Sequence, residues 1–256
     1  MIAMGGARLL VERNVRAYRR QWYVFASGFA EPLLYLLSIG IGVGELVGRI
    51  PGPGGQLVSY REFVAPGMLA AAAMNGAVLD TTFNFFVKFK YQGVYDAMLA
   101  TPLRPFDIAA GEVSWSLIRG AAYAAAFLVA MLLFGLVHSW WALLVVPAAV
   151  LIGFGFAGAG LGATTYMRSW TDFDLVSAAL VPMFLFSGTF FPLSRYPGWF
   201  SWVVKATPLY QGVALERSLV FGALDWTTPL HALYLVALGV FGVRVASRRL
   251  ALLLTA

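Results

Sequence analysis

Three ionisable residues lie within long apolar stretches of the sequence, where a charged side chain is costly. Glu31 precedes Pro32 in the first stretch, Asp80 lies in the next, and Arg119 lies in a third. At the centre of a bilayer an aspartate costs about 2.5–3.5 kcal/mol on insertion scales, so such residues usually face a cavity or a partner. Glu31 and Asp80 can line a transport path or gate, or they can form structural polar contacts between helices. Arg119 can pair with one of them, or it can extend towards the headgroups.

Motifs for other kinds of chemistry are missing from the sequence. It contains no G-x-S-x-G and no H-E-x-x-H pattern. None of the three lysines, Lys88, Lys90 and Lys205, follows a glycine, so a phosphate-binding GK[ST] loop is excluded. There is no cysteine, and His138 and His231 lie far apart, without the spacing of metal ligands. We therefore expect no catalytic residue, no metal site and no bound cofactor in this chain. Any ATP that drives its function, with its Mg²⁺, must bind to another subunit.

The composition is that of a membrane protein. Of 256 residues, 60% are hydrophobic and only 12% are charged, and the mean hydropathy is +0.77. Soluble domains contain about 25% charged residues, so the polar surface of a soluble fold is missing. The net charge is +6, but the basic residues cluster at the ends of apolar stretches. This placement favours anionic lipid headgroups as their partners and not nucleic acid.

Six apolar stretches are predicted to be membrane-spanning helices, since about 20 apolar residues cross the hydrocarbon core. The predicted spans are residues 22–48, 64–87, 113–137, 140–163, 175–191 and 229–246. The fifth span is short, and the apolar segment 192–228 after it is interrupted by charged residues and prolines. We predict one or two short re-entrant helices there, covered by protein or by a wet cavity. The expected fold is a single all-α transmembrane domain over residues 1–256.

The distribution of basic residues predicts the orientation. With six spans, twelve of the 18 lysines and arginines lie on the side of both termini and of the loop 88–112. Positively charged residues accumulate on the cytoplasmic side, so both termini and this loop are expected in the cytoplasm. Residues 8–22 are predicted to form an amphipathic helix that lies flat in the inner membrane interface.

Two segments resemble a known family. "YQGVYDAMLATPLRPFDIAAGE", residues 91–112, resembles the cytoplasmic loop of type-2 ABC exporter permeases, especially the branch of nodulation-factor, lipooligosaccharide and drug exporters. Residues 180–222 resemble that family's hallmark, a P-x-x-x-x-S-G-x-x-F-P-L pattern followed by P-x-W and by a proline before a helix with E-R. The matching residues are Pro182, Ser187, Gly188, Phe191, Pro192, Leu193, Pro197, Trp199, Pro208, Glu216 and Arg217.

The resemblance implies the membrane subunit of an ATP-driven exporter. Such a subunit works as a dimer, with a second copy or a paralogue, and with two ATPase subunits that bind ATP and Mg²⁺. It implies a location in the bacterial cytoplasmic membrane. An aromatic, weakly charged path suits an amphipathic cargo such as a lipid, a glycolipid, a lipid-linked glycan or a hydrophobic drug.

The resemblance also implies a coupling helix between the second and third spans, which docks into a groove on the ATPase. Residues 91–100 fit a short helix that Thr101-Pro102 ends. Tyr91, Tyr95 and Leu99 recur at i, i+4 and i+8 and so share one face, which we expect to enter the groove. The expected coupling residues are Tyr91, Gln92, Gly93, Val94, Tyr95, Asp96, Met98 and Leu99. The alternative is a plain solvated loop.

A transport path would run along the first, second and fifth spans. The residues expected on this path or its gate are Glu31, Asp80, Phe184, Phe186, Ser187, Phe190, Phe191 and Trp199. The aromatic residues among them can form an outer gate, or they can form an interfacial belt.

Two other classes of function compete with the exporter. A proton-coupled secondary transporter could use Glu31 and Asp80 as relays, but it predicts internal repeats, and none is visible in the sequence. A membrane-embedded lipid-modifying enzyme would need a nucleophile and a base, and no such set is visible. Purification with or without an ATPase partner would distinguish the three.

Overall fold

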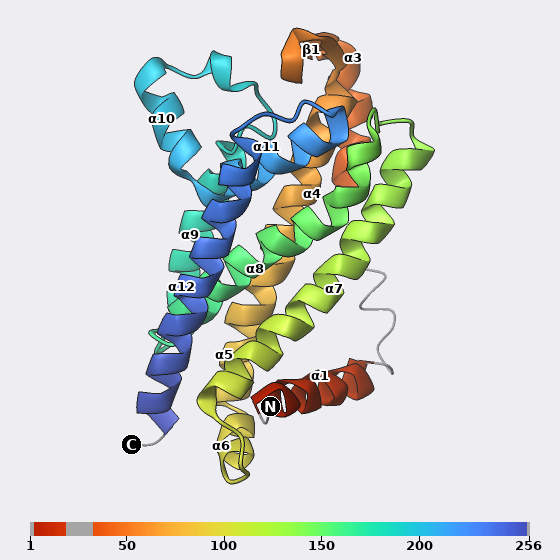
Figure 1. Cartoon of the computed structure of the whole chain (residues 1–256). Helices are drawn as coiled ribbons and strands as arrows, with labels where there is room; N and C mark the ends of the chain where they lie inside the picture. The colour runs from red at the N-terminus through yellow and green to blue at the C-terminus, as the bar shows by residue number, and fades with distance from the viewer. Residues whose placement is uncertain (1–2, 19–32, 255–256) are drawn as a thin grey trace.

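The computed structural model describes residues 3–18 and 33–254, and it consists mainly of long helices (Figure 1). Within the described residues, four helical segments are long and apolar enough to cross a membrane: Tyr60–Lys90, Pro105–Leu133, Trp140–Thr164 and Thr228–Leu253. Figure 1 shows helices α1 and α6 and the end of α12 near one end of the molecule, and β1, α10 and α11 near the other. The chain is therefore a multi-helix membrane protein.

The first of these four segments is one continuous helical rod with an irregular turn inside it. It comprises α4 (Tyr60–Leu79), the π-helical turn η3 (Asp80–Asn84) and α5 (Phe85–Lys90). A capping box begins α4, because the Glu62 amide donates to Ser59 Oγ at 3.3 Å and the Ser59 amide donates to Glu62 Oε2 at 2.6 Å. In η3, the hydroxyls of Thr81 and Thr82 bond to carbonyls one turn earlier. Single π-helical turns of this kind occur frequently at functional sites.

The next two segments are α7 (Pro105–Leu133) and α8 (Val145–Thr164), the latter preceded by the short helix η4 (Trp140–Leu144). The last is α12 (Thr228–Leu254), which crosses α8 through glycines. A Cβ added at Gly158 would lie 2.4 Å from the Gly239 carbonyl oxygen, and one added at Gly242 would lie 2.2 Å from the Gly158 carbonyl carbon. The two backbones thus touch directly, which only residues without a side chain permit.

The segment of the fifth predicted span is different from the other long helices. Helix α9 covers only Asp172–Leu185, is shorter than the predicted span 175–191, and contains no buried residue. It is followed by the short helix η5 (Leu193–Arg195), by α10 (Gly198–Ala206) and by α11 (Pro208–Phe221). One short 3₁₀ turn and the two helices α10 and α11 thus occupy the segment predicted to be re-entrant, and the re-entrant path itself stays a prediction.

The segment that follows the first predicted span contains a small hairpin that the sequence did not predict. Helical turns η1 (Ile39–Val43) and α3 (Gly44–Val47) precede strand β1 (Arg49–Pro51), which pairs antiparallel with β2 (Leu57–Ser59). The helical turn η2 (Pro53–Gly55) joins the strands, and Gly54 and Gly55 adopt positive φ there. The start of the first predicted span lies outside the described residues.

Helix α1 (Ala3–Tyr18) packs across the beginning of α7 (Figure 1). Its buried residues Gly6, Leu10 and Asn14 follow each other at four-residue spacing. A Cβ at Gly111 of α7 would lie 2.7 Å from Leu10 Cβ, so the contact is close. The helix therefore begins earlier than the predicted residues 8–22, and one face is held by protein. Residues 19–22 lie outside the described part of the chain.

Candidate functional site

The predicted coupling segment forms a short helix, α6 (Val94–Leu99), which projects at the end of the molecule beyond α5 and α7 (Figure 1). Gly93 precedes it with a φ of 57°, a conformation that glycine adopts without strain. After α6, the Thr101 hydroxyl donates to the Met98 carbonyl at 2.5 Å. Helix α7 then begins at Pro105, and its Asp107 carboxylate accepts a hydrogen bond from the Arg104 amide at 3.0 Å. Local hydrogen bonds thus hold both ends of the connection between α6 and α7.

Tyr95 anchors α6 to the two membrane helices beside it. Its side chain is 1% exposed, its ring stacks on Phe85 with 4.8 Å between centroids, and its hydroxyl donates to Glu112 Oε1 at 3.0 Å. The other oxygen of Glu112 accepts from Lys88 Nζ at 2.7 Å. Burial and the neighbouring Glu112 carboxylate raise the pKa of Tyr95 well above its ordinary value, so the hydroxyl remains a hydrogen-bond donor at neutral pH.

This placement corrects one expectation from the sequence. Tyr91, Tyr95 and Leu99 were predicted to present one face to a partner, but Tyr95 points into its own chain and is not available on the surface. The reason is that α5 and α7 supply a stacking ring and a carboxylate for it. The remaining predicted coupling residues are exposed or half-buried: Tyr91, Gln92, Gly93, Val94, Asp96, Met98 and Leu99. Docking of α6 to a partner stays a prediction, and this surface is the one available for it.

Asp80 forms a buried ion pair inside the membrane segment. Its Oδ1 lies 3.1 Å from Arg119 Nη2, and both side chains are less than a tenth exposed. The Asn84 amide donates to the same carboxylate oxygen at 2.8 Å. Asp80 therefore makes a polar contact between helices with Arg119 as its partner, and whether Asp80 also lines a transport path stays a prediction. Glu31 lies outside the described residues.

Two ion pairs, one buried and one partly buried, join the same two helical segments, with their charges reversed. Asp80 lies on η3 and its partner Arg119 on α7, whereas Lys88 lies on α5 and its partner Glu112 on α7. The pairs are separated by about two helical turns along each helix. A buried charge that loses its partner is strongly destabilising, so the two pairs fix how these helices are aligned. The pairing of Lys88 with Glu112 was not predicted from the sequence, although both residues lie in the polar loop region between predicted spans two and three.

The residues predicted for a path or gate after α9 do not form one cluster. Phe184 contacts Phe190 edge to face at 5.1 Å, and the fully buried Ser187 donates to the Phe184 carbonyl at 2.9 Å. Phe186 contacts a different ring, Phe200 of α10, at 5.2 Å. Two of the predicted residues are mostly exposed: Phe191 (56%) and Trp199 (73%). Whether they form a gate or a belt stays a prediction.

Arg217, part of the second sequence motif, hydrogen-bonds to two segments that are distant in the sequence. Its guanidinium donates to the Phe63 carbonyl at 3.2 Å and to the Gly188 carbonyl at 2.9 Å, and it lies 3.8 Å from the centre of the Phe63 ring. Its neighbour Glu216 is fully buried. Arg217 therefore connects α11 with α4 and with the turn after α9. The arginine of the E-R pattern thus has a structural role, since it connects these three elements.

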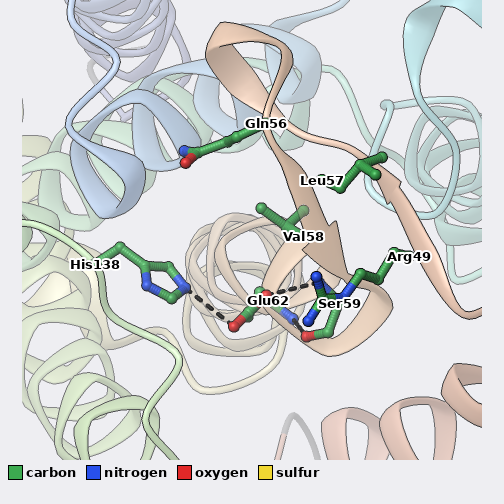
Figure 2. Close-up of a pocket in the computed structure, with 7 residues that line it drawn as sticks. All are labelled: Arg49, Gln56, Leu57, Val58, Ser59, Glu62 and His138. Atoms are coloured by element: carbon green, nitrogen blue, oxygen red, sulfur yellow. Dashed lines mark hydrogen bonds and ion pairs between the residues drawn. The ribbon is translucent and has the colours of Figure 1, made fainter.

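A polar pocket of about 210 Å³ lies at the end of the molecule opposite α6 (Figure 2). Its lining residues are Arg49, Gln56, Leu57, Val58, Ser59, Glu62 and His138. Figure 2 shows His138 pointing towards Glu62, with 3.1 Å between Nε2 and Oε1. This contact connects the turn between α7 and α8 with the start of α4. None of the residues predicted for the site from the sequence lies in this pocket, and within the described residues no group of His, Asp and Glu could hold a metal ion.

Comparisons with known proteins cover most of the chain. The family model described as ABC-2 type transporter matches residues 6–221. Nodulation protein J of Rhizobium leguminosarum bv. viciae is 30% identical over 245 residues, 93% of this chain and 92% of that protein. The protein of the same name from R. leguminosarum bv. trifolii is 33% identical over 213 residues, 82% of this chain and 79% of that protein. The family match includes α6 and both ion pairs.

Proposed function

Because the chain belongs to the ABC-2 type transporter family, we propose that it is the permease subunit of an exporter driven by a separate ATPase. The family makes it a membrane transport subunit and not an enzyme by itself. In the proposed assembly, two such subunits form the membrane part, and each contacts an ATPase subunit that binds ATP and Mg²⁺. The chain would lie in the bacterial cytoplasmic membrane with both termini and α6 inside.

The observation that carries this proposal is the construction of α6. A short helix projects beyond the membrane helices, and one buried tyrosine ties it to both α5 and α7. A loosely attached loop would absorb the movement of a docked partner, whereas an anchored helix passes it on. Gln92, Asp96 and Ala97 are exposed on or beside this helix and supply the surface for docking. Charged groups at the rim of such a contact set its register more than its affinity.

An amphipathic cargo fits the chain best. The segment from Phe184 to Trp199 is rich in aromatic side chains and contains only one charged residue, Arg195. Such a surface suits a lipid, a glycolipid or lipid-linked glycan, or a hydrophobic drug, and not a small ion. The relatives named Nodulation protein J are similar over most of their length, which supports a related cargo class.

A proton-coupled transporter is the weaker alternative. It would need Asp80 to bind and release protons, but that carboxylate is engaged by Arg119 and Asn84. Both contacts would have to break before this carboxylate could carry a proton, and this opposes a relay function.

Reconstitution in lipid vesicles tests the ATPase dependence. The purified chain alone should hydrolyse no ATP, and hydrolysis should appear when the separate ATPase subunit is added, because the chain has no phosphate-binding loop. The control is the same ATPase subunit without the permease. Hydrolysis by the rigorously purified chain, or cargo movement driven by a proton gradient without any ATPase, would contradict the proposal.

A further inference from the structure

Helix α5 carries ring contacts on two sides. Phe85 stacks on Tyr95 of α6 at 4.8 Å, and the adjacent Phe86 contacts Trp170 at 5.6 Å and Phe173 at 5.2 Å. Consecutive helical residues point about 100° apart, so the two contacts lie on different sides of the helix. Helix α5 therefore lies between the coupling helix and the start of α9.

Five rings on the second side form what we call the aromatic cluster: Phe83, Phe86, Tyr91, Trp170 and Phe173. Tyr91 stacks on Trp170 at 5.3 Å, with 22° between the ring planes. Phe83 contacts Trp170 at 5.6 Å and Phe173 at 5.8 Å, and Trp170 contacts Phe173 at 5.8 Å. The cluster thus joins η3 and α5 to the turn before α9 and to its first residues.

The turn that holds Trp170 is itself fixed. The Asp172 carboxylate accepts hydrogen bonds from the amides of Arg168 at 2.6 Å and Ser169 at 3.0 Å. These backbone bonds lower the pKa of Asp172, so it remains ionised and the turn remains closed at neutral pH. The rings of Trp170 and Phe173 are consequently held at the start of α9.

Helix α9 is only partly buried along its length. None of its residues is buried; Leu175 is 72% exposed and Val181 is 56% exposed. Val176, Leu180, Met183 and Phe184 pack partly against the core along its length, and the ring contacts at its first turn connect it to α5. Movement of α5 would therefore reach α9 through these ring contacts at its first turn.

We propose that the aromatic cluster passes movement of the coupling helix α6 to α9. The movement would pass from Tyr95 to Phe85 of α5, and from the adjacent Phe86 to the rings of Trp170 and Phe173. The inference rests on the proposed function, because it needs an ATPase that moves α6. Trp170 and Phe173 are positioning residues in this scheme, and they contact neither ATP nor cargo. The Tyr95–Glu112 bond supplies a separate connection from α6 to α7.

A single reporter on α9 tests this route. The chain has no cysteine, so Ser177→Cys, at an exposed position of α9, provides one thiol for labelling. The complex with the ATPase subunit is compared without nucleotide and after trapping with ATP and vanadate. In the parent, trapping should change the rate of thiol labelling. In Trp170→Ala/Phe173→Ala the complex should still form and hydrolyse ATP, but the change in labelling should be lost.

Three further variants show whether a loss of the labelling change is due to the rings of the aromatic cluster. Phe200→Ala removes a ring from the contacts around Phe186, away from the cluster, and should keep the labelling change. Trp170→Phe retains a ring and should restore most of it. Phe173→Leu retains apolar volume without a ring and should reduce the change if the double variant does not fold.

The outcomes separate the inference from the proposed function. If the parent forms no complex with an ATPase, the proposed function fails and the inference with it. If the parent forms an active complex and the double variant keeps the labelling change, only the inference is wrong. If the folded double variant no longer binds the ATPase, the exposed rings of Tyr91 and Trp170 form a docking surface, and the inference is again contradicted.

Discussion

Arg119→Met is expected to reduce the yield of folded protein strongly, because it leaves Asp80 buried without its charged partner. Removing one member of a buried ion pair costs about 3–5 kcal/mol. Asp80→Asn removes the negative charge of this pair and should also destabilise the protein, although the Asn84 contact can be kept by an amide. Thermal unfolding and gel-filtration yield in detergent measure both effects.

The double variant Asp80→Leu/Arg119→Met provides the decisive comparison. Since it removes both charges, it should recover much of the stability that either single variant loses. The exposed pair Arg8–Glu12 supplies the control, because Arg8→Met should change stability by only about 0–1 kcal/mol. If Arg119→Met folds like the parent while Asp80→Asn abolishes transport, Asp80 belongs to the transport path and is not a structural partner.

Tyr95→Ala is expected to uncouple ATP hydrolysis from export while the membrane helices remain folded. The substitution removes the ring that stacks on Phe85 and the hydroxyl that binds Glu112. Truncating a buried aromatic side chain to alanine costs about 3–5 kcal/mol, and here the loss falls on the attachment of a short helix. Complex yield, ATP hydrolysis and export should be measured on the same preparations.

Two further variants separate the parts of this anchor. Tyr95→Phe keeps the stacked ring and loses only the hydrogen bond to a charged group, worth about 1.5–3 kcal/mol, so it should have a smaller effect. Asp96→Ala changes an exposed position and should have the smallest effect at physiological salt. Normal complex yield and export in both Tyr95→Ala and Leu99→Ala would show that α6 is not the coupling element.

Composition and turn residues could predict the class of fold and the position of α6. The low charge content requires a membrane protein, and Gly93 and Pro102 limit a helix between them. The spacing of Tyr91, Tyr95 and Leu99 predicts one shared helical face, but α6 begins only at Val94, so Tyr91 lies outside this helix. Spacing also cannot show which face of α6 meets the protein's own chain. That depended on Phe85 and Glu112, which approach Tyr95 only after α5 and α7 pair.

Contacts between distant segments account for the other differences. Pairing of Asp80 with Arg119 was an open alternative, since a single sequence does not show which buried charges meet. The link between Phe86 and Trp170 was not predicted, because 84 positions separate the two rings along the chain and no motif connects them. The hairpin at residues 49–59 was overlooked because its strands have only three residues each.

The central claim is that the exposed side of α6 docks on a separate ATPase subunit, and site-specific photocrosslinking in intact membranes tests it most directly. A photoreactive residue at Ala97, exposed on α6, should crosslink to the ATPase subunit. The same residue at Leu57, which is 62% exposed in the hairpin at the opposite end, should give no such product. Crosslinking to the ATPase from position 57, or none from position 97 in membranes that export cargo, would contradict the account.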